Sequence, residues 1–168
     1  ELKDLMTLKD HEEIVVLDGL NVVKKYQKFC GKLQKIFFTS NILESDPGFF
    51  KLIPNEIKQI VSKEEISEGV GYKYHRGIIA IGEKPAFKKI DNHNGENTII
   101  LNGVVNSENV GSICRSLAAF NINNLIIDQK SCSPYLRRAV RVSMGNVFKL
   151  NIFRVDRLDK TISLLKDK

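Results

Sequence analysis

The second half of the chain alternates short apolar runs with amphipathic helical patterns, and this alternation restricts its fold more than any other feature. The apolar, strand-like runs fall at 98–101, 125–127 and 148–155. The helical patterns fall at 108–120, 133–144 and 156–165. Repeated strand, crossover helix and strand predict an α/β fold with a parallel sheet and right-handed connections. Only three such strands would leave an unpaired edge and a partly uncovered core, which is typical of an incomplete domain.

The first half also mixes strands and helices, and it predicts a small layered αβα domain. Strand-like runs fall at 14–17, 35–39 and 77–81. Helical patterns fall at 20–29, 55–61 and 63–68. The polar stretch that follows has a proline and a glycine but no apolar period, which is typical of an interdomain linker. The predicted organisation is therefore a first domain over 1–84, a linker over 85–97 and an incomplete second domain over 98–168.

The net charge of +6 is placed unevenly along the chain. Residues 1–84 hold 13 Lys and Arg against 13 Asp and Glu, whereas residues 85–168 hold 13 against 7. A basic half suits a polyanionic partner such as nucleic acid, although many lysine-rich proteins are basic only for solubility. No window of the sequence approaches 18 uninterrupted apolar residues, which excludes a membrane span.

The three cysteines argue against a disulfide framework and against a zinc site. Their number is odd, and no two of them have the C-x-x-C spacing. They are Cys30, Cys114 and Cys132. We therefore expect reduced thiols in a cytoplasmic protein, and no bound metal. None of the three histidines has partners at catalytic spacing, so none is given a role.

The most informative stretch is the helix predicted over 108–120, because ligands of open α/β folds bind at the carboxyl ends of the strands. At about 100° per residue, five apolar side chains share one face, which we expect to be buried. They are Val110, Ile113, Cys114, Leu117 and Phe120. Arg115 lies on the opposite side, among small neighbours. These neighbours are Gly111, Ser112, Ser116 and Ala119. Such a face indicates close approach of another backbone or of a polyanion, or else a structural ion pair at a packed interface.

Two further groups in the second half have open interpretations. Asn109 either caps the helix or points a polar group at a ligand. Arg137, Arg138 and Arg141 project from one side of the next predicted helix, where they either grip RNA phosphates or form a solvated face. No G-x-G-x-x-G sequence is present, so a generic nucleotide-binding α/β protein is the weakest interpretation.

Four short motifs, in order, resemble the SpoU/TrmH branch of the SPOUT RNA ribose 2′-O-methyltransferases. The most specific is NVGSICRS at 109–116, which matches the family's Asn-x-Gly-(three residues)-Arg-(Ser/Thr) motif. SMGNVF at 143–148 matches the family's Ser-x-Gly-Ala-x-Phe turn, with asparagine in place of the usual alanine. Upstream, VVLDG at 15–19 and GIIA at 77–80 resemble two strands of the family's N-terminal domain. The four motifs are spread over nearly the whole chain, so the resemblance extends to both halves.

This resemblance implies a fold, an activity and a set of site residues. The first domain would be an αβα RNA substrate-binding fold like those of certain ribosomal proteins, and the second would be the start of a knotted SPOUT methyltransferase domain. The activity would be methyl transfer from S-adenosylmethionine to a ribose 2′-hydroxyl, with ribosomal RNA as the first choice of substrate and transfer RNA as the second. Arg115 would act at the hydroxyl with support from Asn109, and Ser116 would bind RNA together with the three arginines of the next helix. Family members usually form homodimers.

The role of Arg115 and the activity of the chain stay open at this point. A protonated arginine is a poor base and is better suited to clamping a phosphate and stabilising oxyanion charge, but both roles are retained. The family's later motifs, which form the cofactor pocket and the knot, do not occur before Lys168. Gly145 would be peripheral to that pocket at most. We therefore expect this chain to bind the cofactor poorly and to be inactive without those motifs, and the alternative function is a non-catalytic RNA-binding module.

Overall fold

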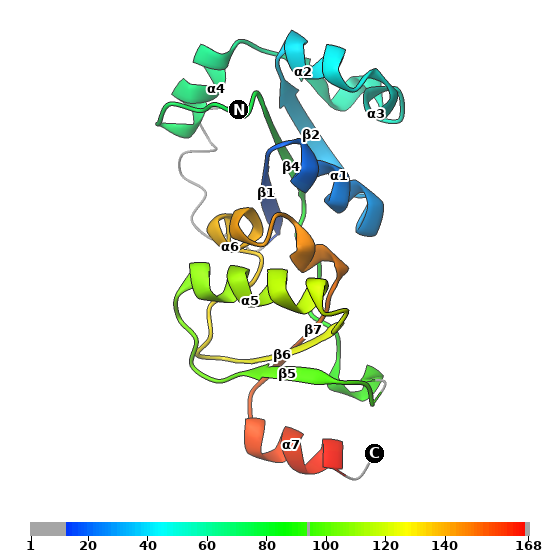
Figure 1. The fold of residues 1–168 in the computed structure, drawn as a ribbon, viewed down its shortest axis with the longest axis vertical. Helices are drawn as coiled ribbons and strands as arrows, with labels where there is room; N and C mark the ends of the chain where they lie inside the picture. The colour runs from blue at the N-terminus through cyan, green and yellow to red at the C-terminus, as the bar shows by residue number, and fades with distance from the viewer. Residues whose placement is uncertain (1–12, 94, 167–168) are drawn as a thin grey trace. The chain divides into compact units, whose positions relative to one another are not determined.

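The chain is divided into two compact units, of which one runs to Lys84 and the other begins at Pro85. The structure is a computed structural model that describes residues 13–93 and 95–166. Each unit is built around its own β-sheet, as Figure 1 shows.

The sheet of the first unit has four strands of mixed direction. They are β1 (Ile14–Asp18), β2 (Leu33–Phe38), β3 (Lys58–Ile60) and β4 (Ile78–Glu83). Their order is β1-β4-β2-β3, in which β4 is antiparallel to both of its neighbours and β3 is parallel to β2. The helix predicted over 55–61 is wrong. Pro54 leads into a single 3₁₀ turn, η2 (Asn55–Ile57), and the chain then extends as β3.

Helices cover both faces of this sheet and so produce the predicted αβα layering. They are α1 (Leu20–Phe29), α2 (Ser40–Ser45), α3 (Pro47–Lys51) and α4 (Lys63–Val70). On one face, the Tyr26 ring of α1 lies so close to Gly82 that a Cβ there would come within 2.4 Å of the ring. On the other face, Ile66 and Val70 of α4 pack in a buried cluster with Phe37 and Ile79. A capping box between Ser62 and Glu65 fixes the start of α4, since it satisfies two backbone donors.

The sheet of the second unit is parallel throughout, which confirms the predicted α/β class. Its strands are β5 (Thr98–Leu101), β6 (Asn124–Asp128) and β7 (Asn151–Val155), in the order β5-β6-β7. The central strand, β6, is buried along its whole length. The edge strand, β5, exposes the side chains of Ile99 and Ile100.

Helices lie on both faces of this second sheet (Figure 1). On one face are α5 (Ser107–Ala119) and α6 (Arg137–Val142), and on the other is α7 (Leu158–Lys166). The face toward α7 is closed by a cluster around Ile126 and Phe153, which Leu158 and Leu165 cover. Two boundaries differ from the prediction, because α6 is shorter than 133–144 and the 3₁₀ turn η4 (Asn146–Lys149) precedes β7.

Within the predicted linker, residues 88–93 pack against strand β7 of the second unit. The backbone N–H of Lys88 donates to the carbonyl of Ile152 at 2.7 Å, and Lys88 forms a parallel bridge with Phe153. The turn η3 (Ile90–Asn92) then brings His93 against the Phe153 ring. Although the composition of this stretch is that of a linker, its backbone extends the fold of the second unit.

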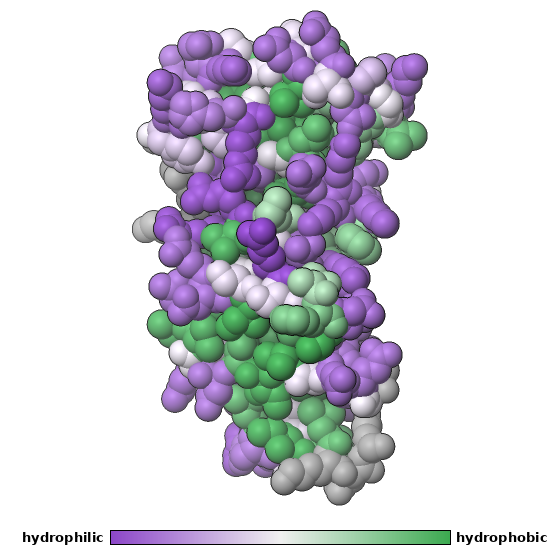
Figure 2. Space-filling view, viewed as in Figure 1, coloured by the Kyte–Doolittle hydropathy of each residue, from purple (hydrophilic) through white to green (hydrophobic). Residues whose placement is uncertain are grey.

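Figure 2 shows apolar side chains gathered at the surface of the second unit. The large hydrophobic side chains exposed there are Ile99, Ile100, Val105, Phe120, Met144, Ile162 and Leu164. Within the described residues, no helix is long and apolar enough to cross a membrane.

Candidate functional site

The amino end of α5 is fixed by Asn106. Its side chain accepts hydrogen bonds from the backbone N–H groups of Glu108, at 2.8 Å, and of Asn109, at 3.3 Å. Asn109 therefore lies inside the first helical turn, and the interpretation of Asn109 as a helix cap is wrong. Its side chain is exposed to solvent, as required of a group that would meet a ligand.

Gly111 allows α5 and α6 to approach at the level of their backbones. A Cβ at Gly111 would lie 2.7 Å from the carbonyl oxygen of Ala139 and 2.9 Å from the Cβ of Val142. These are distances at which the helices would have to shift apart. The small residue at this position is therefore explained by a neighbouring backbone, which was one of the alternatives that the helix pattern left open.

The apolar face of α5 is buried as predicted, except at its end. Val110, Cys114 and Leu117 are buried, and Ile113 is half-buried. The expectation for Phe120 is wrong, since its side chain is 77% exposed. Phe120 is the C-cap of a helix that ends at Ala119, so the helical period no longer applies to it.

Arg115 lies on the solvent side of α5, next to the exposed Ser112 and Ser116. Within the described residues its guanidinium forms no hydrogen bond and no ion pair, so the interpretation as a structural ion pair is not supported there. Asn109 is six residues away, which is about 9 Å along a helix and a third of a turn around it. The helix alone thus exposes both groups but does not bring them into contact.

The three arginines of α6 differ in their surroundings. Arg138 donates to the Oε1 of Glu108, and both residues are exposed. Arg137 and Arg141 are half-buried, and the guanidinium of Arg141 forms no hydrogen bond or ion pair with another described residue. The positive charge of Arg138 is therefore compensated by an acid, whereas that of Arg141 is not.

The Ser-Met-Gly-Asn stretch that follows α6 forms a tight left-handed turn. Ser143 is fully buried and its hydroxyl donates to the Val140 carbonyl at 2.9 Å. Met144 and Gly145 both have positive φ, and the Gly145 N–H bonds to the same carbonyl. Glycine readily takes this conformation, which gives Gly145 a backbone role that does not depend on any ligand.

The carboxyl end of the central strand holds a group that sequence reasoning missed. Asp128, the last residue of β6, is buried, and it accepts hydrogen bonds from Gly103 and from Ser131. Burial alone would raise the pKa of Asp128, but the hydrogen bonds from Ser131 and Gly103 outweigh burial and hold the pKa below its ordinary value. The sequence signal that could have indicated Asp128 was its position, because it is an acidic residue directly after the predicted strand 125–127.

The described histidines and cysteines form no catalytic or metal-binding cluster with one another. Buried His93 accepts from the Gly95 N–H at Nδ1, so its Nε2 carries the proton toward Thr98, 2.6 Å away. His75 is exposed, and His11 lies outside the described residues. None of the three cysteines forms a disulfide bond within the described part of the chain. No group of three or more His, Cys, Asp and Glu side chains among the described residues could hold a metal ion.

Comparison with known proteins relates the second unit to a family of RNA methylases. Residues 96–168 match the model of the SpoU rRNA Methylase family. The match covers most of the second unit and less than half of the chain. A relative from Staphylococcus saprophyticus, whose name places it in the TrmH family of tRNA/rRNA methyltransferases, is 25% identical over 172 residues, or 93% of this chain and 66% of the relative. A 23S rRNA (guanosine-2′-O-)-methyltransferase from Acinetobacter baylyi is 23% identical over 115 residues, or 64% of this chain and 46% of the relative.

The fold of the whole chain is also found among solved structures. A SpoU methyltransferase from Streptomyces viridochromogenes, crystallised with the cofactor AdoMet, superposes with a TM-score of 0.79 over 99% of this chain and 64% of its own, at 15% identity. This likeness confirms the predicted fold. The chain spans only about a third of the length of other curated relatives, at 32% and 30%.

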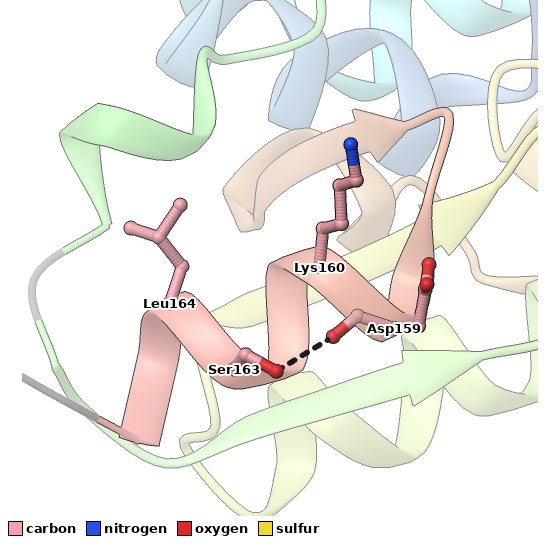
Figure 3. A pocket seen from close by; sticks show the side chains of 4 residues that line it. All are labelled: Asp159, Lys160, Ser163 and Leu164. Atoms are coloured by element: carbon pink, nitrogen blue, oxygen red, sulfur yellow. Dashed lines mark hydrogen bonds between the residues drawn. The ribbon is translucent and has the colours of Figure 1, made fainter.

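The second unit has surface depressions on α7 and beside β5. One, of about 400 Å³, lies on α7 and is lined by Asp159, Lys160, Ser163 and Leu164 (Figure 3). Ser163 donates to the backbone carbonyl of Asp159 at 3.1 Å, so its hydroxyl proton is engaged with the backbone. A second, of about 270 Å³, lies between Thr98 at the amino end of β5 and Ile162 of α7, and His93 also lines it. The Nε2 of His93 donates to the Thr98 hydroxyl, which in turn donates to the Glu96 carbonyl, so His93 does not act as a base toward Thr98.

Proposed function

We propose that this protein is part of an RNA methyltransferase that transfers a methyl group from S-adenosylmethionine to a ribose 2′-hydroxyl, with ribosomal RNA as the first candidate substrate and transfer RNA as the second. The observation that carries this proposal is the exposed guanidinium of Arg115, without a partner among the described residues, on a unit that matches the SpoU rRNA Methylase family. The name of the Acinetobacter relative, a guanosine-2′-O-methyltransferase of 23S rRNA, supports the choice of ribose and of ribosomal RNA.

Arg115 is suited to positioning and stabilising charge. A guanidinium offers five N–H donors in a planar fork and no acceptor, so it matches a phosphate bidentately. With Ser112 and Ser116 beside it, no described acid competes for these donors. We therefore assign Arg115 the role of clamping the phosphate next to the target ribose and stabilising negative charge on the 2′-oxygen as its proton leaves. This is preferred to a role as the base.

S-adenosylmethionine would supply an electrophilic methyl group. The Streptomyces structure is a complex with AdoMet, which supports this cofactor. The described residues do not fit it by themselves. The depression on α7 is lined by exposed side chains of a single helix, and the other lies at the amino end of β5. The buried carboxylate of Asp128 already accepts internal hydrogen bonds. We therefore assign no cofactor-binding residue in this chain.

The RNA would lie along the solvent side of α5 and α6. Arg137 and Arg141 would contact phosphates, and Ser116 and Asn109 would contact the substrate from α5. Arg138 contributes less than the sequence suggested, because Glu108 compensates its charge. The first unit would recruit the RNA substrate, and the whole protein would be a cytoplasmic homodimer. Cysteines that form no disulfide among the described residues are consistent with that compartment.

Substitution of Arg115 tests the proposal. In the full-length protein encoded by the gene, Arg115→Ala should lower the turnover number for RNA methylation by about a hundredfold, as loss of a transition-state contact would. Arg115→Lys should retain only part of the wild-type turnover number, because an ammonium group cannot bind a phosphate through two parallel N–H donors as a guanidinium does. Arg157→Ala is the control, since Arg157 is exposed and lies directly before α7, the helix on the other face of the sheet. Unchanged methylation by Arg115→Ala would refute the mechanism.

The alternative is a non-catalytic RNA-binding module, and the poor fit of the described residues to the cofactor favours it. Calorimetric titration of S-adenosylmethionine into this chain and into the full-length protein separates the two functions. Binding to the longer protein alone supports the enzyme. Binding to neither, together with salt-dependent binding of RNA, supports the module.

A further inference from the structure

A hydrogen-bonded clamp joins the loops that follow β5 and β6 in the second unit. The clamp consists of Gly103 and Val104 in the first loop, and of Asp128, Ser131 and Cys132 around the second. Both loops leave the carboxyl ends of parallel strands, where ligands of open α/β folds bind. The clamp therefore lies at the edge of the sheet from which the candidate site is built.

The centre of the clamp is the carboxylate of Asp128, which is only 7% exposed. The Gly103 N–H donates to both of its oxygens, at 3.1 and 3.2 Å. The N–H and the hydroxyl of Ser131 donate to its Oδ1 at 2.8 and 2.6 Å. Three donors thus converge on one buried carboxylate, which is an arrangement that strongly favours its charged form.

The clamp also fixes the backbone that leads to α5. The Ser131 hydroxyl oxygen accepts from the Val104 N–H at 3.0 Å, and the Val104 carbonyl accepts from the Cys132 N–H at 3.0 Å. Two residues after Val104, Asn106 caps the helix that carries Asn109 and Arg115. The position of this helix start is therefore set by Asp128 through Ser131 and the loop, and Asp128 itself does not reach the exposed face.

We propose that Asp128 is a positioning residue for the reaction at α5, which it serves by holding the loop 103–106 to the end of the central strand. This inference rests on the proposed function. An asparagine at this position keeps the size of the side chain but replaces one acceptor oxygen by a donor. The amide NH2 would therefore face the Gly103 or Ser131 donors, and the negative charge that attracts them would be lost, so the hold on the loop would weaken.

The test compares Asp128→Asn with Asp156→Asn in the full-length protein. Asp156 follows the neighbouring strand β7 and is exposed, and among the described residues its side chain accepts only from the Gln129 side chain. The same aspartate-to-asparagine change is therefore made outside the clamp. Hydrogen exchange of the Gly103 and Val104 amides should accelerate by about tenfold or more in Asp128→Asn alone. At a temperature where both variants are folded, the turnover number of Asp128→Asn should fall about tenfold or more, with the KM for RNA changed less than about threefold.

Ser131→Ala is a second variant, in case Asp128→Asn does not fold. It removes the bridging hydroxyl and keeps the carboxylate, so a smaller loss of turnover is expected together with faster exchange at Val104. Unchanged exchange in Asp128→Asn, or faster exchange with an unchanged turnover number, would overturn the inference. If the wild-type protein transfers no methyl group, it is the proposed function that fails, and the exchange data still report whether the clamp exists.

Discussion

The guanidinium of Arg138 on α6 donates through both Nε and Nη2 to a single carboxylate oxygen of Glu108 in the first turn of α5. The pair ties together the two helices that carry the candidate site. It also sets an acid beside the surface on which RNA would lie.

Removing the charge of Glu108 should strengthen RNA binding. Glu108→Gln frees the charge of Arg138 for phosphates, so we expect the Kd for RNA to fall about two- to fivefold at low salt, and its dependence on salt to steepen by about one counterion. The stability should change by less than about 1 kcal/mol, since the pair is exposed. Fluorescence anisotropy across a salt series measures both effects.

Asp159→Asn is the matched control for this prediction. Asp159 also lies in the first turn of a helix and also pairs with an arginine, Arg157, but it belongs to α7. An equal gain in RNA affinity from this control would show a general charge effect and contradict a site on α5 and α6.

Alanine at Gly111 should destabilise the second unit although alanine is the better helix former. The new Cβ would lie 2.7 Å from the Ala139 carbonyl, so we expect a loss of about 1–3 kcal/mol in the free energy of unfolding, measured by urea denaturation. Gly48→Ala is the control, because a Cβ at that helical position would come no nearer than 3.9 Å to Asp46. A stabilised Gly111→Ala variant would be inconsistent with the close helix contact.

Acid should weaken the second unit through Asp128. Its pKa in the folded state lies below its ordinary value near 3.9, so between the two values the unfolded chain binds more protons than the folded one. The stability it contributes is therefore present above about pH 4 and is lost as the pH falls through the folded pKa. Denaturation between about pH 5 and 3 should show a shallower slope in Asp128→Asn. An identical slope in both proteins would contradict the assignment.

The thiol of Cys114 should resist alkylation in the native protein. Burial raises its pKa to about 12, and its side chain is fully buried in α5, so little thiolate is present or accessible at pH 8. Iodoacetamide followed by mass spectrometry should label Cys132, which is only half-buried, well before Cys114. The order of labelling should disappear in denaturant. Early labelling of Cys114 would mean that the packing between α5 and the sheet is looser than described.

Local patterns predicted the elements whose signal lies in consecutive residues. The apolar run at 14–17 and the helix at 20–29 match β1 and α1 because burial and period coincide there. The helix predicted over 55–61 was wrong. Pro54 and the one helical turn after it are too short a signal to distinguish a helix from a turn followed by a strand that pairs with β2. Pairing with a distant strand cannot be found from local periodicity.

The site was predictable to the extent that it lies on one helix. The solvent side of α5, with Arg115 and Ser116, follows from helical geometry alone. The cap at Asn106 was missed because two candidate asparagines lie three residues apart, and only the backbone decides between them. The clamp at Asp128 joins residues that are 25 positions apart, so it needed the strand order β5-β6-β7 to be known.

The contact at Gly111 has a consequence for how ligands are discriminated. Because α5 and α6 meet backbone to backbone, the Cα atoms of Arg115 and Arg141 keep a constant spacing, and side-chain torsions alone can adjust the separation of their charges. A polyanion that contacts both arginines therefore meets two positive charges whose separation is confined to a narrow range. A nucleic acid whose phosphates are spaced differently would have to deform to contact both arginines, and the energy of this deformation would weaken its binding.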